Sequence, residues 1–300
     1  MTPSDQMFLL VIPGYNARPF LADLVASLSA QRWTLWQAVF VDDCSSDGTL
    51  GTLRNLLAAH SLTDRFDVVQ IEQRRYKACN VFHALQNRGQ PGDVVVMLDA
   101  DDHLATPEAL HRLAREYEQG WDVVWSNWRG SDGSRGTSAH LNPFIDPRRQ
   151  PLVSSHLFSF RRRLFDAVLA SDLQDDDGRW FDAGCDVALA WPILDQTIKR
   201  KHIEDVLCIY NCANPLSHDK LNRTVRPLVS PAQARTAAIL RRRSGKPLVV
   251  DQEFLHSHLY ELLQAAMLSQ RALLPNEIAA AIARQAGISG RRPGGSDAAT

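Results

Sequence analysis

Residues 94–102 read VVVMLDADD, and this stretch decides the fold. Its first five residues form a continuous apolar run, which is typical of a strand buried on both faces of a parallel sheet. The acidic cluster Asp99-Ala100-Asp101-Asp102 then lies at the carboxyl end of that strand. Amphipathic helices separate further strands, which are predicted at residues 8–12, 37–41, 67–71 and 122–125. The alternation predicts an α/β fold with a mostly parallel, Rossmann-like sheet and helices on both faces.

The pattern changes after residue 126, where Gly, Ser, Asn and Pro predict a long loop over the sheet up to residue 151. Thr106 is predicted to cap a helix that begins at Pro107, and Asp251 is predicted to cap a helix with an apolar face from Phe254 to Met267. Strands are also predicted at 156–161 and 201–211, and helices at 163–170, 184–196, 231–243 and 275–286. We expect two halves of one domain at 1–126 and 127–228, a C-terminal helical extension at 229–288 and a disordered tail at 289–300.

Composition restricts the class of protein. The formal net charge is −1, so no overall positive field attracts nucleic acid. The five cysteines are irregularly spaced without a CxxC pair, which predicts reduced thiols and neither a disulfide framework nor a zinc knuckle. No stretch approaches the roughly 18 apolar residues that a membrane helix needs, and the first residues do not resemble a signal peptide. We therefore expect a cytoplasmic protein; peripheral contact with the inner face of a membrane and a homodimer both stay open.

Three polar clusters follow predicted strands: PGYN at 13–16, DDCSSD at 42–47 and DADD at 99–102. Ligands of an open parallel sheet bind beyond the carboxyl ends of its strands, so these clusters predict one site. A carboxylate-rich site without an adjacent basic run accepts a phosphate only when a hard divalent cation such as Mn²⁺ or Mg²⁺ intervenes. The alternative for the Asp-X-Asp alone is an Asp-rich turn before the next helix.

The three segments together resemble a known family. The stretches LLVIPGYNARPFLADLVASLSAQ at 9–31, AVFVDDCSSDGT at 38–49 and VVVMLDADD at 94–102 are similar, in order and spacing, to the donor-site segments of family 2 glycosyltransferases with the GT-A fold. The resemblance covers about residues 7–215. It implies a metal-dependent, inverting enzyme that takes a sugar from a nucleotide-sugar donor. The implied acceptor is a hydroxyl of a glycan, a lipid-linked glycan or a protein.

The resemblance also implies roles in binding the nucleoside. Pro13, Tyr15 and Asn16 match positions that line the base, and Asp43 matches the carboxylate that hydrogen-bonds the edge of the base. Lys77 stands where the family often has a basic residue near the donor. The surrounding RRYKACN at 74–80 departs from the Gly-rich stretch that is usual there. An ordinary exposed helix lysine is therefore the equal alternative for Lys77.

Further roles concern the metal and the chemistry. Asp99 matches the ribose-side member of the Asp-X-Asp, Ala100 lies between its two acids in the donor site, and Asp101 matches the metal ligand that bridges the diphosphate. His218 is either a late metal ligand or a surface-loop histidine. The segment FDAGCD at 181–186 resembles the acidic motif at the start of a helix, and Asp186 matches the catalytic base.

The match at Asp186 departs from the family in one position, because Cys185 replaces the usual preceding acid. We interpret Cys185 as a neighbour and not as a nucleophile. The basic run at 161–163 could meet a phosphate-bearing acceptor, although a solvated charge run is the favoured interpretation. Trp128 could stack on a sugar ring, whereas Trp121 and Trp125 are expected in the core.

The expected mechanism is direct displacement with inversion at the anomeric carbon, in which Asp186 takes the proton of the acceptor hydroxyl. UDP is the expected nucleotide, with GDP and dTDP not excluded. A sugar nucleotidyltransferase is the first alternative, but VIPGYNARP lacks the Gly-rich, basic phosphate loop that such an enzyme has near its first strand. A catalytically inactive GT-A-like binding domain is the second. The absence of GxGxxG after the first strand excludes a Rossmann dehydrogenase.

Overall fold

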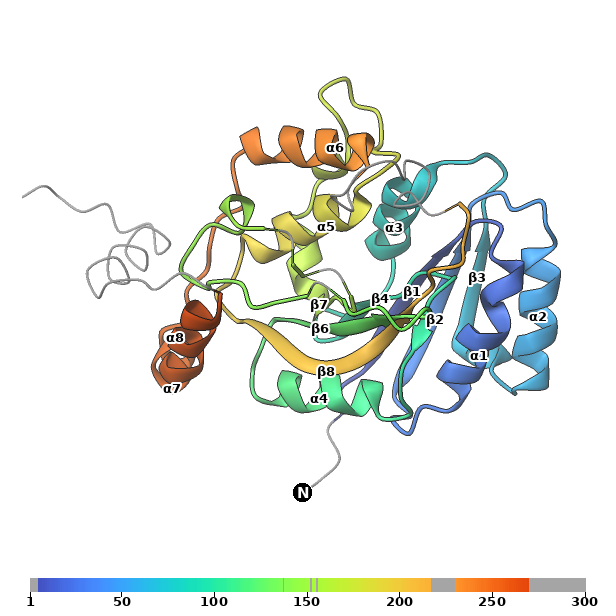
Figure 1. Cartoon of the computed structure of the whole chain (residues 1–300), viewed down its shortest axis with the longest axis horizontal. Coiled ribbons are helices and arrows are strands. Elements are labelled where there is room, and N and C mark those ends of the chain that lie inside the picture. The colour runs from blue at the N-terminus through green and yellow to red at the C-terminus, as the bar shows by residue number, and fades with distance from the viewer. Residues whose placement is uncertain (1–4, 137, 152, 155, 217–229, 270–300) are drawn as a thin grey trace, which may run out of the picture.

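A computed structural model describes residues 5–136, 138–151, 153–154, 156–216 and 230–269. Its centre is one eight-stranded sheet with the order β3-β2-β1-β4-β7-β6-β8-β5 (Figure 1). Most neighbouring strands are parallel, but β7 runs antiparallel to both of its neighbours and β5 runs antiparallel to β8. The strands are β1 (Phe8–Gly14), β2 (Trp36–Asp42), β3 (Phe66–Gln70), β4 (Val94–Met97), β5 (His103–Leu104), β6 (Val123–Gly130), β7 (Ser159–Arg161) and β8 (Arg200–Tyr210).

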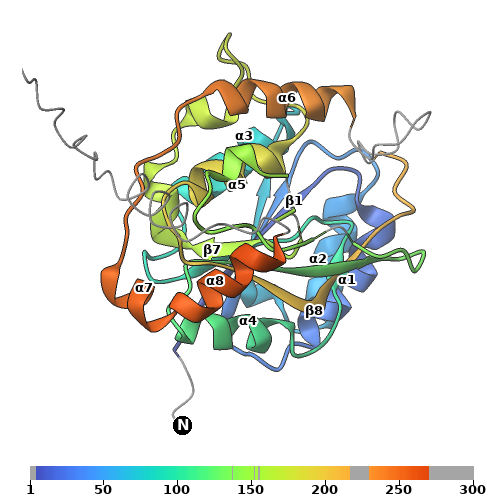
Figure 2. The ribbon, with the colours of Figure 1, turned by 60° about the vertical axis from the view of Figure 1, so that its left-hand side comes forward.

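Helices cover both faces of the sheet, as the sequence predicts. Alternate residues of β1 point to opposite faces, so Phe8 packs with residues of α1, α2 and α4, and Leu9 packs with residues of α3, α5 and α6. Figures 1 and 2 show these two groups of helices on opposite sides of the sheet. The helices are α1 (Leu21–Ser29), α2 (Thr49–Ala59), α3 (Tyr76–Gln86), α4 (Ala109–Glu118), α5 (Cys185–Leu194), α6 (Pro231–Arg242), α7 (Gln252–Ser257) and α8 (Leu259–Leu268). The predicted α/β class is confirmed.

The predicted start of α4 at Thr106-Pro107 is wrong. The helix begins at Ala109, and its N-cap Glu108 makes no side-chain capping bond. The amide of Gln31 takes over this role, because its Nε2 donates to the Thr106 carbonyl at 2.8 Å and its Oε1 accepts from the Leu110 amide at 3.2 Å. The capping group therefore comes from Gln31, which follows α1 and is far from α4 in the sequence.

The C-terminal part contains one more difference. Asp251 caps α7 as predicted, since its carboxylate accepts from the amide of Phe254 at 3.0 Å. The expected single helix is nevertheless interrupted at His258, whose ring stacks on the Phe254 ring with centroids 4.0 Å apart. The predicted helix at 275–286, the tail at 289–300 and His218 lie outside the described residues. Among the described helices, none has the length and apolar character required to cross a lipid bilayer.

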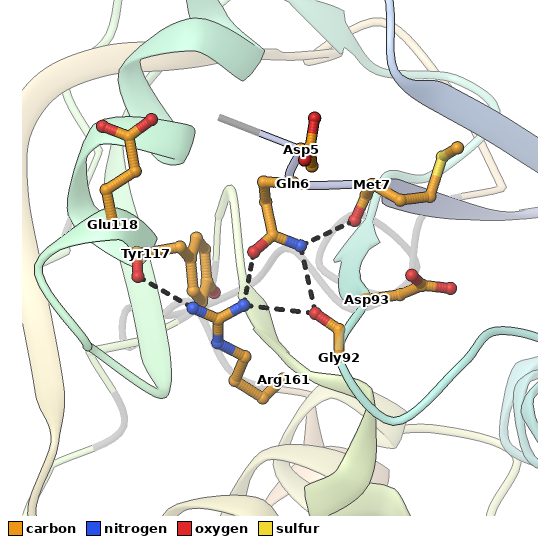
Figure 3. Close-up of a pocket in the computed structure, with 8 residues that line it drawn as sticks. All are labelled: Asp5, Gln6, Met7, Gly92, Asp93, Tyr117, Glu118 and Arg161. Atoms are coloured by element: carbon orange, nitrogen blue, oxygen red, sulfur yellow. Dashed lines mark hydrogen bonds between the residues drawn. The ribbon is translucent and has the colours of Figure 1, made fainter. Parts of the chain in front are cut away.

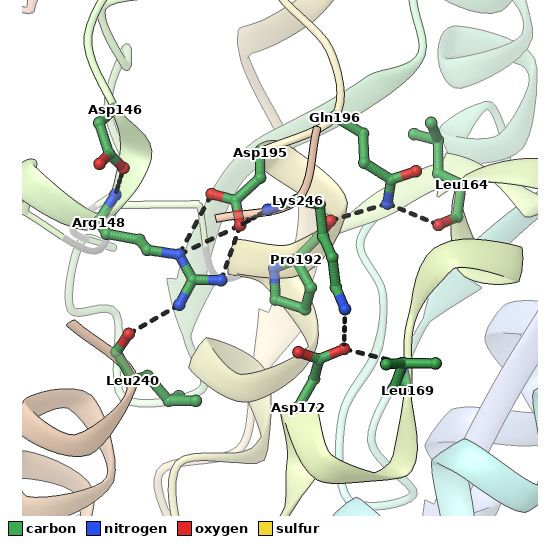
Figure 4. Close-up of polar contacts among 10 residues, drawn as sticks. All are labelled: Asp146, Arg148, Leu164, Leu169, Asp172, Pro192, Asp195, Gln196, Leu240 and Lys246. Atoms are coloured by element: carbon green, nitrogen blue, oxygen red, sulfur yellow. Dashed lines mark hydrogen bonds and ion pairs between the residues drawn. The ribbon is translucent and has the colours of Figure 1, made fainter. Parts of the chain in front are cut away.

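The loop predicted at 126–151 is shorter than expected, because β6 continues to Gly130. Within the remaining segment, Arg148 lies buried and pairs with Asp195 at the end of α5, with a closest N···O distance of 2.7 Å (Figure 4). Arg148 also donates to the carbonyl of Leu240 on α6 at 2.7 Å. The predicted helix at 163–170 consists of two 3-10 segments, Arg162–Ala167 and Ala170–Leu173.

The favoured interpretation of the run at 161–163 as solvated holds only for Arg163, which is exposed, whereas Arg161 is half-buried and Arg162 is buried. Arg161 donates to Gln6, to the Tyr117 carbonyl at 2.8 Å and to the Gly92 carbonyl at 3.2 Å (Figure 3). These residues line a cavity of about 440 Å³ at the edge of the sheet where β1 and β4 begin. Arg162 is buried and donates to backbone carbonyls, and Arg163 pairs with a carboxylate. The run therefore ties segments of the fold together.

Candidate functional site

The carboxyl ends of β1, β2 and β4 meet at one edge of the sheet. The backbone amide of Asp43 donates to the Gly14 carbonyl at 2.8 Å, and the amide of Ala100 donates to the Pro13 carbonyl at 3.1 Å. A Cβ at Gly14 would lie only 2.7 Å from the Phe40 ring and 3.0 Å from the Ala100 methyl group. The three polar clusters that follow these strands are thus joined by close backbone packing.

Beyond β1 and β2, a small polar surface surrounds Asp43. Its carboxylate accepts from the backbone amides of Arg75 at 2.7 Å and Tyr76 at 3.0 Å, where α3 begins. The guanidinium of Arg74 lies 3.8 Å from the centre of the Tyr15 ring. Arg74 is not among the site residues predicted from the sequence. The pair of arginines at 74–75, close to Lys77, was the signal that could have identified it.

Asn16 shapes the turn that follows β1. It has a positive φ of 48°, and its Oδ1 accepts from the Ser46 amide at 2.9 Å. Its own amide donates to the Ser45 hydroxyl at 2.8 Å. Asparagine tolerates the left-handed region because its short polar side chain can bond locally. Asn16 therefore fastens the β1 turn to the β2 turn.

Asp99, Asp101 and Asp102 bring one carboxylate oxygen each within 4.8 Å of one another. Burial raises the pKa of Asp101, and repulsion from Asp99 adds to the effect. Burial, followed by repulsion from Asp101, raises the pKa of Asp102 well above its ordinary value. The three groups offer only hard oxygen ligands and an excess of negative charge, so this donor set fits Mg²⁺ or Mn²⁺.

Two asparagines that the sequence analysis missed hold this cluster. The side-chain amide of Asn214 donates to Asp101 Oδ2 at 2.7 Å, and the backbone amide of Asn211 donates to Asp102 Oδ1 at 2.9 Å. Both follow β8, so the chain after β8 wraps around the acidic cluster. Asp102 is 2% exposed and acts as a structural neighbour of the two more accessible acids.

Lys77 connects the acidic cluster with α5. Its Nζ lies 2.7 Å from Asp99 Oδ1 and 2.6 Å from Asp186 Oδ1. Burial lowers the pKa of Lys77, but attraction to Asp186 and Asp99 outweighs this effect, and the pKa lies well above its ordinary value. An exposed helix lysine, the alternative for Lys77, is wrong. Its role towards a donor stays a prediction.

Asp186 stands in the first turn of α5. The helix begins after Gly184, whose φ of +74° suits glycine, and Thr236 of α6 donates its hydroxyl to the Ala183 carbonyl at 2.9 Å. Burial raises the pKa of the neighbouring Cys185 thiol far above its ordinary value, which agrees with a neighbour that is not a nucleophile.

The burial of the tryptophans agrees with the prediction that Trp121 and Trp125 lie in the core. Trp121 and Trp125 are each 1% exposed and belong to the core. Trp128 is only partly buried and lies close to the rings of His156 and Tyr210.

Comparisons with known proteins show the family and the fold. A family model described as glycosyl transferase family 2 matches residues 9–174, more than half of the chain. The putative teichuronic acid biosynthesis glycosyltransferase TuaG of Bacillus subtilis is 35% identical over 102 residues, which cover 34% of this chain and 38% of TuaG. An undecaprenyl-phosphate 4-deoxy-4-formamido-L-arabinose transferase of Pseudomonas syringae pv. syringae is 34% identical over 170 residues, which cover 54% of this chain and 49% of that protein. The chain thus spans half or less of the length of these two relatives.

Solved structures share the fold. S. aureus TarS 1–349 in complex with UDP has a TM-score of 0.51 at 18% identity, covering 94% of this chain and 89% of that one. The mannosyltransferase PcManGT from Pyrobaculum calidifontis, in complex with GDP-Man and Mn²⁺, has a TM-score of 0.52 at 18% identity, covering 95% and 81%. At this identity the likeness shows the fold alone, and that fold is the predicted GT-A type. Because the family model matches more than half of the chain and the fold is shared, the chain belongs to glycosyl transferase family 2.

Proposed function

We propose that the chain transfers a sugar from a nucleoside-diphosphate sugar to a hydroxyl acceptor, with UDP as the first nucleotide to test. One observation carries this proposal: carboxylates from the ends of β2 and β4 and from the start of α5 lie around the Lys77 side chain and the first turn of α3. The relatives named above support the reaction class by their names, which include a teichuronic acid biosynthesis glycosyltransferase and an undecaprenyl-phosphate transferase. The proposed acceptor class is therefore a glycan or a lipid-linked glycan, with a protein as the third choice.

In this proposal the nucleoside lies over β1 and β2. Pro13, Tyr15 and Asn16 line the base, and Asp43 accepts from an N–H at the edge of the base. Asp43 already accepts two backbone amides, but an ionised carboxylate has about four lone-pair sites, so a further donor can be accommodated. The Arg74 guanidinium lies over the Tyr15 ring in this region.

The diphosphate lies beyond β4. Asp99 faces the ribose, with Ala100 packed beneath it, and Asp101 is the proposed metal ligand. When bound, a divalent cation offsets the charge that develops on the leaving nucleoside diphosphate. Lys77 supplies a fixed positive charge beside the same position and forms an ion pair with Asp186.

Asp186 is the proposed base of an inverting displacement. The acceptor hydroxyl oxygen forms a bond to the anomeric carbon while its proton passes to the Asp186 carboxylate. The bond from the anomeric carbon to the diphosphate oxygen breaks at the same time, and the electron pair leaves with the nucleoside diphosphate. No covalent enzyme intermediate is formed, which agrees with a buried Cys185 thiol whose pKa is raised.

A thermal-shift screen of UDP, GDP, dTDP and their sugar conjugates, with and without Mn²⁺, tests the donor site. We expect at least one nucleotide to raise the melting temperature only when the metal is present, because ligand binding to the folded state adds RT ln(1 + [L]/Kd) to stability. If no nucleotide gives a metal-dependent shift, the proposal is wrong.

The variant Asp186→Asn distinguishes transfer from a binding domain without catalysis. We expect it to bind the donor as the wild type does and to lose turnover by roughly a thousandfold, since general-base catalysis contributes about 10²–10⁴-fold. Asp182→Asn is the matched control, because Asp182 is an exposed acid four residues earlier. Turnover of Asp186→Asn at the wild-type level would contradict the assignment of the base.

A further inference from the structure

Three aromatic rings form a corner beside the acidic cluster. We call Trp128, His156 and Tyr210 the aromatic corner. The Trp128 ring centroid lies 5.1 Å from that of Tyr210 and 5.5 Å from that of His156. The His156 and Tyr210 rings are stacked at 5.3 Å with their planes 16° apart. All three are partly exposed, so the corner differs from the fully buried tryptophans of the core.

The sheet places the aromatic corner next to the proposed diphosphate position. β5, which follows the acidic cluster, is antiparallel to β8, with His103 opposite Ile209. The residue after Tyr210 donates its backbone amide to Asp102 Oδ1 at 2.9 Å. The corner therefore adjoins the acidic cluster through the end of β8.

The strand order also separates the corner from the nucleoside. β2 and β1 lie on one side of β4, whereas β7, β6 and β8 lie on the other. A donor whose base lies over β1 and β2 and whose diphosphate lies over β4 directs its sugar, and the attacking acceptor, towards the corner. This step rests on the proposed function.

The strand is irregular at Trp128, whose ring packs in part against the hydrophobic core. The pairing of β6 with β8 shifts between Ser126 and Asn127 and again between Asn127 and Trp128. Bulges of this kind re-aim a side chain and are common beside active sites. The chain then folds back so closely that a Cβ at Gly136 would lie 2.7 Å from the indole, which fixes the ring.

The indole nitrogen provides a second observation. In the described part of the chain, the buried Nε1–H of Trp128 has no hydrogen-bond acceptor. A buried donor without an acceptor is costly, and a ligand hydroxyl would supply the missing partner. An aromatic face together with an N–H donor is the combination that an amphipathic sugar ring requires, since its C–H face packs on the aromatic ring and its hydroxyls hydrogen-bond at the edge.

We propose that Trp128, His156 and Tyr210 form a subsite for a pyranose ring. The ring belongs either to the transferred sugar of the donor or to the terminal sugar of the acceptor, and the two sources share the same chemistry. Trp128 and Tyr210 contribute ring faces, and the Trp128 Nε1–H contributes a hydrogen bond to a ring hydroxyl.

The test compares Tyr210→Ala with the wild type, using the nucleotide that shows a metal-dependent thermal shift. We expect the Kd of the nucleoside diphosphate to change less than twofold, because the corner does not touch the base or the diphosphate. For a donor-sugar subsite, the Kd of the nucleotide sugar rises about tenfold; for an acceptor subsite, the acceptor KM rises about tenfold and the nucleotide-sugar Kd stays constant. Tyr210→Phe, which keeps the ring, restores either value.

A second measurement needs no nucleotide. Saturation-transfer NMR with methyl pyranosides of glucose, galactose, mannose and N-acetylglucosamine should show contact of their ring C–H protons with the wild type, and weaker contact with Tyr210→Ala. His111→Ala is the matched control, because His111 stacks on Trp33 at 5.8 Å and Trp33 lies where β2 begins, at the opposite edge of the sheet. The inference is overturned if Tyr210→Ala leaves nucleotide-sugar Kd, acceptor KM and pyranoside contact unchanged. If only the proposed function is wrong, the methyl pyranosides still contact the wild type in the NMR measurement, and this contact is still weaker with Tyr210→Ala.

Discussion

Removing the positive charge of Lys77 should change metal binding and turnover in opposite directions. The Nζ atom lies 2.6–2.8 Å from oxygens of Asp99 and Asp186, and its side chain is 25% exposed. In Lys77→Met the acidic cluster keeps its carboxylates and loses the nearby cation. Mn²⁺ alone should therefore bind more tightly to the variant than to the wild type.

The size of this effect follows from Coulomb's law. The unit charge of Lys77 and the double charge of Mn²⁺ about 5 Å apart repel by roughly 7 kcal/mol at an effective dielectric constant of 20, and by roughly 2 kcal/mol at the dielectric constant of water. Because a quarter of the Lys77 side chain faces solvent and salt screens the pair, we use the lower figure of about 2 kcal/mol, which corresponds to a roughly thirtyfold lower Kd for Mn²⁺. Turnover should fall by about 10²–10³-fold, the usual loss when one group that stabilises developing charge is removed.

Isothermal titration with MnCl₂ in the absence of nucleotide measures the Kd for Mn²⁺, and the release of nucleoside diphosphate measures turnover. Lys246→Met is the matched control, since Lys246 Nζ pairs with Asp172 at 2.7 Å and its side chain is 14% exposed. Lys246→Met should change neither the Kd for Mn²⁺ nor the turnover. A weaker or unchanged affinity of Lys77→Met for Mn²⁺ would refute the electrostatic reasoning. Unchanged turnover would refute the role of Lys77 in the reaction.

Three further predictions concern stability. Gly184→Ala should lower the free energy of unfolding by about 1–2 kcal/mol in urea titrations, because φ is +74° and the new Cβ would lie 3.1 Å from Thr236; Gly178→Ala, with φ +77° and open space, should cost less. Burial lowers the pKa of His202 to about 4, so stability is present above about pH 6.5, the ordinary histidine value, and is lost as the pH falls through 4. Urea titrations should show a wild-type loss about 2 kcal/mol larger than that of a His202→Phe variant between pH 7 and 4; equal losses would contradict this assignment. Arg148→Met should cost about 3 kcal/mol in the same assay, because its carboxylate partner stays buried and loses its main cation.

Local patterns in the sequence predict the part of the fold that carries the proposed donor site. The apolar run at 94–98 and the polar residues after it become β4 and the acidic cluster, because strand periodicity and turn chemistry are local properties. Asp251 caps its helix for the same reason. The convergence of the three strand ends then follows from the general behaviour of parallel sheets.

Features that depend on distant partners are not visible in the sequence. α4 starts late because Gln31 supplies the cap, and Arg162 is buried because the carbonyls of Leu85 and Arg88 receive its guanidinium. Asn214 carries no motif, yet the fold brings it to Asp101. The reversed direction of β7 belongs to the same class, since strand direction depends on the path of the whole chain.

The contacts of α6 set a lower limit on any shortened version of this protein. A fragment that ends at residue 216 would retain all eight strands and every proposed acidic side chain. It would lack Thr236, whose hydroxyl anchors the Ala183 carbonyl just before Asp186, and the Leu240 carbonyl that receives Arg148. The region around α5, the helix that carries the proposed base, would lose both of these contacts with α6. A minimal working fragment must therefore extend at least to residue 242, beyond the sheet and beyond residues 9–174 that the family model matches.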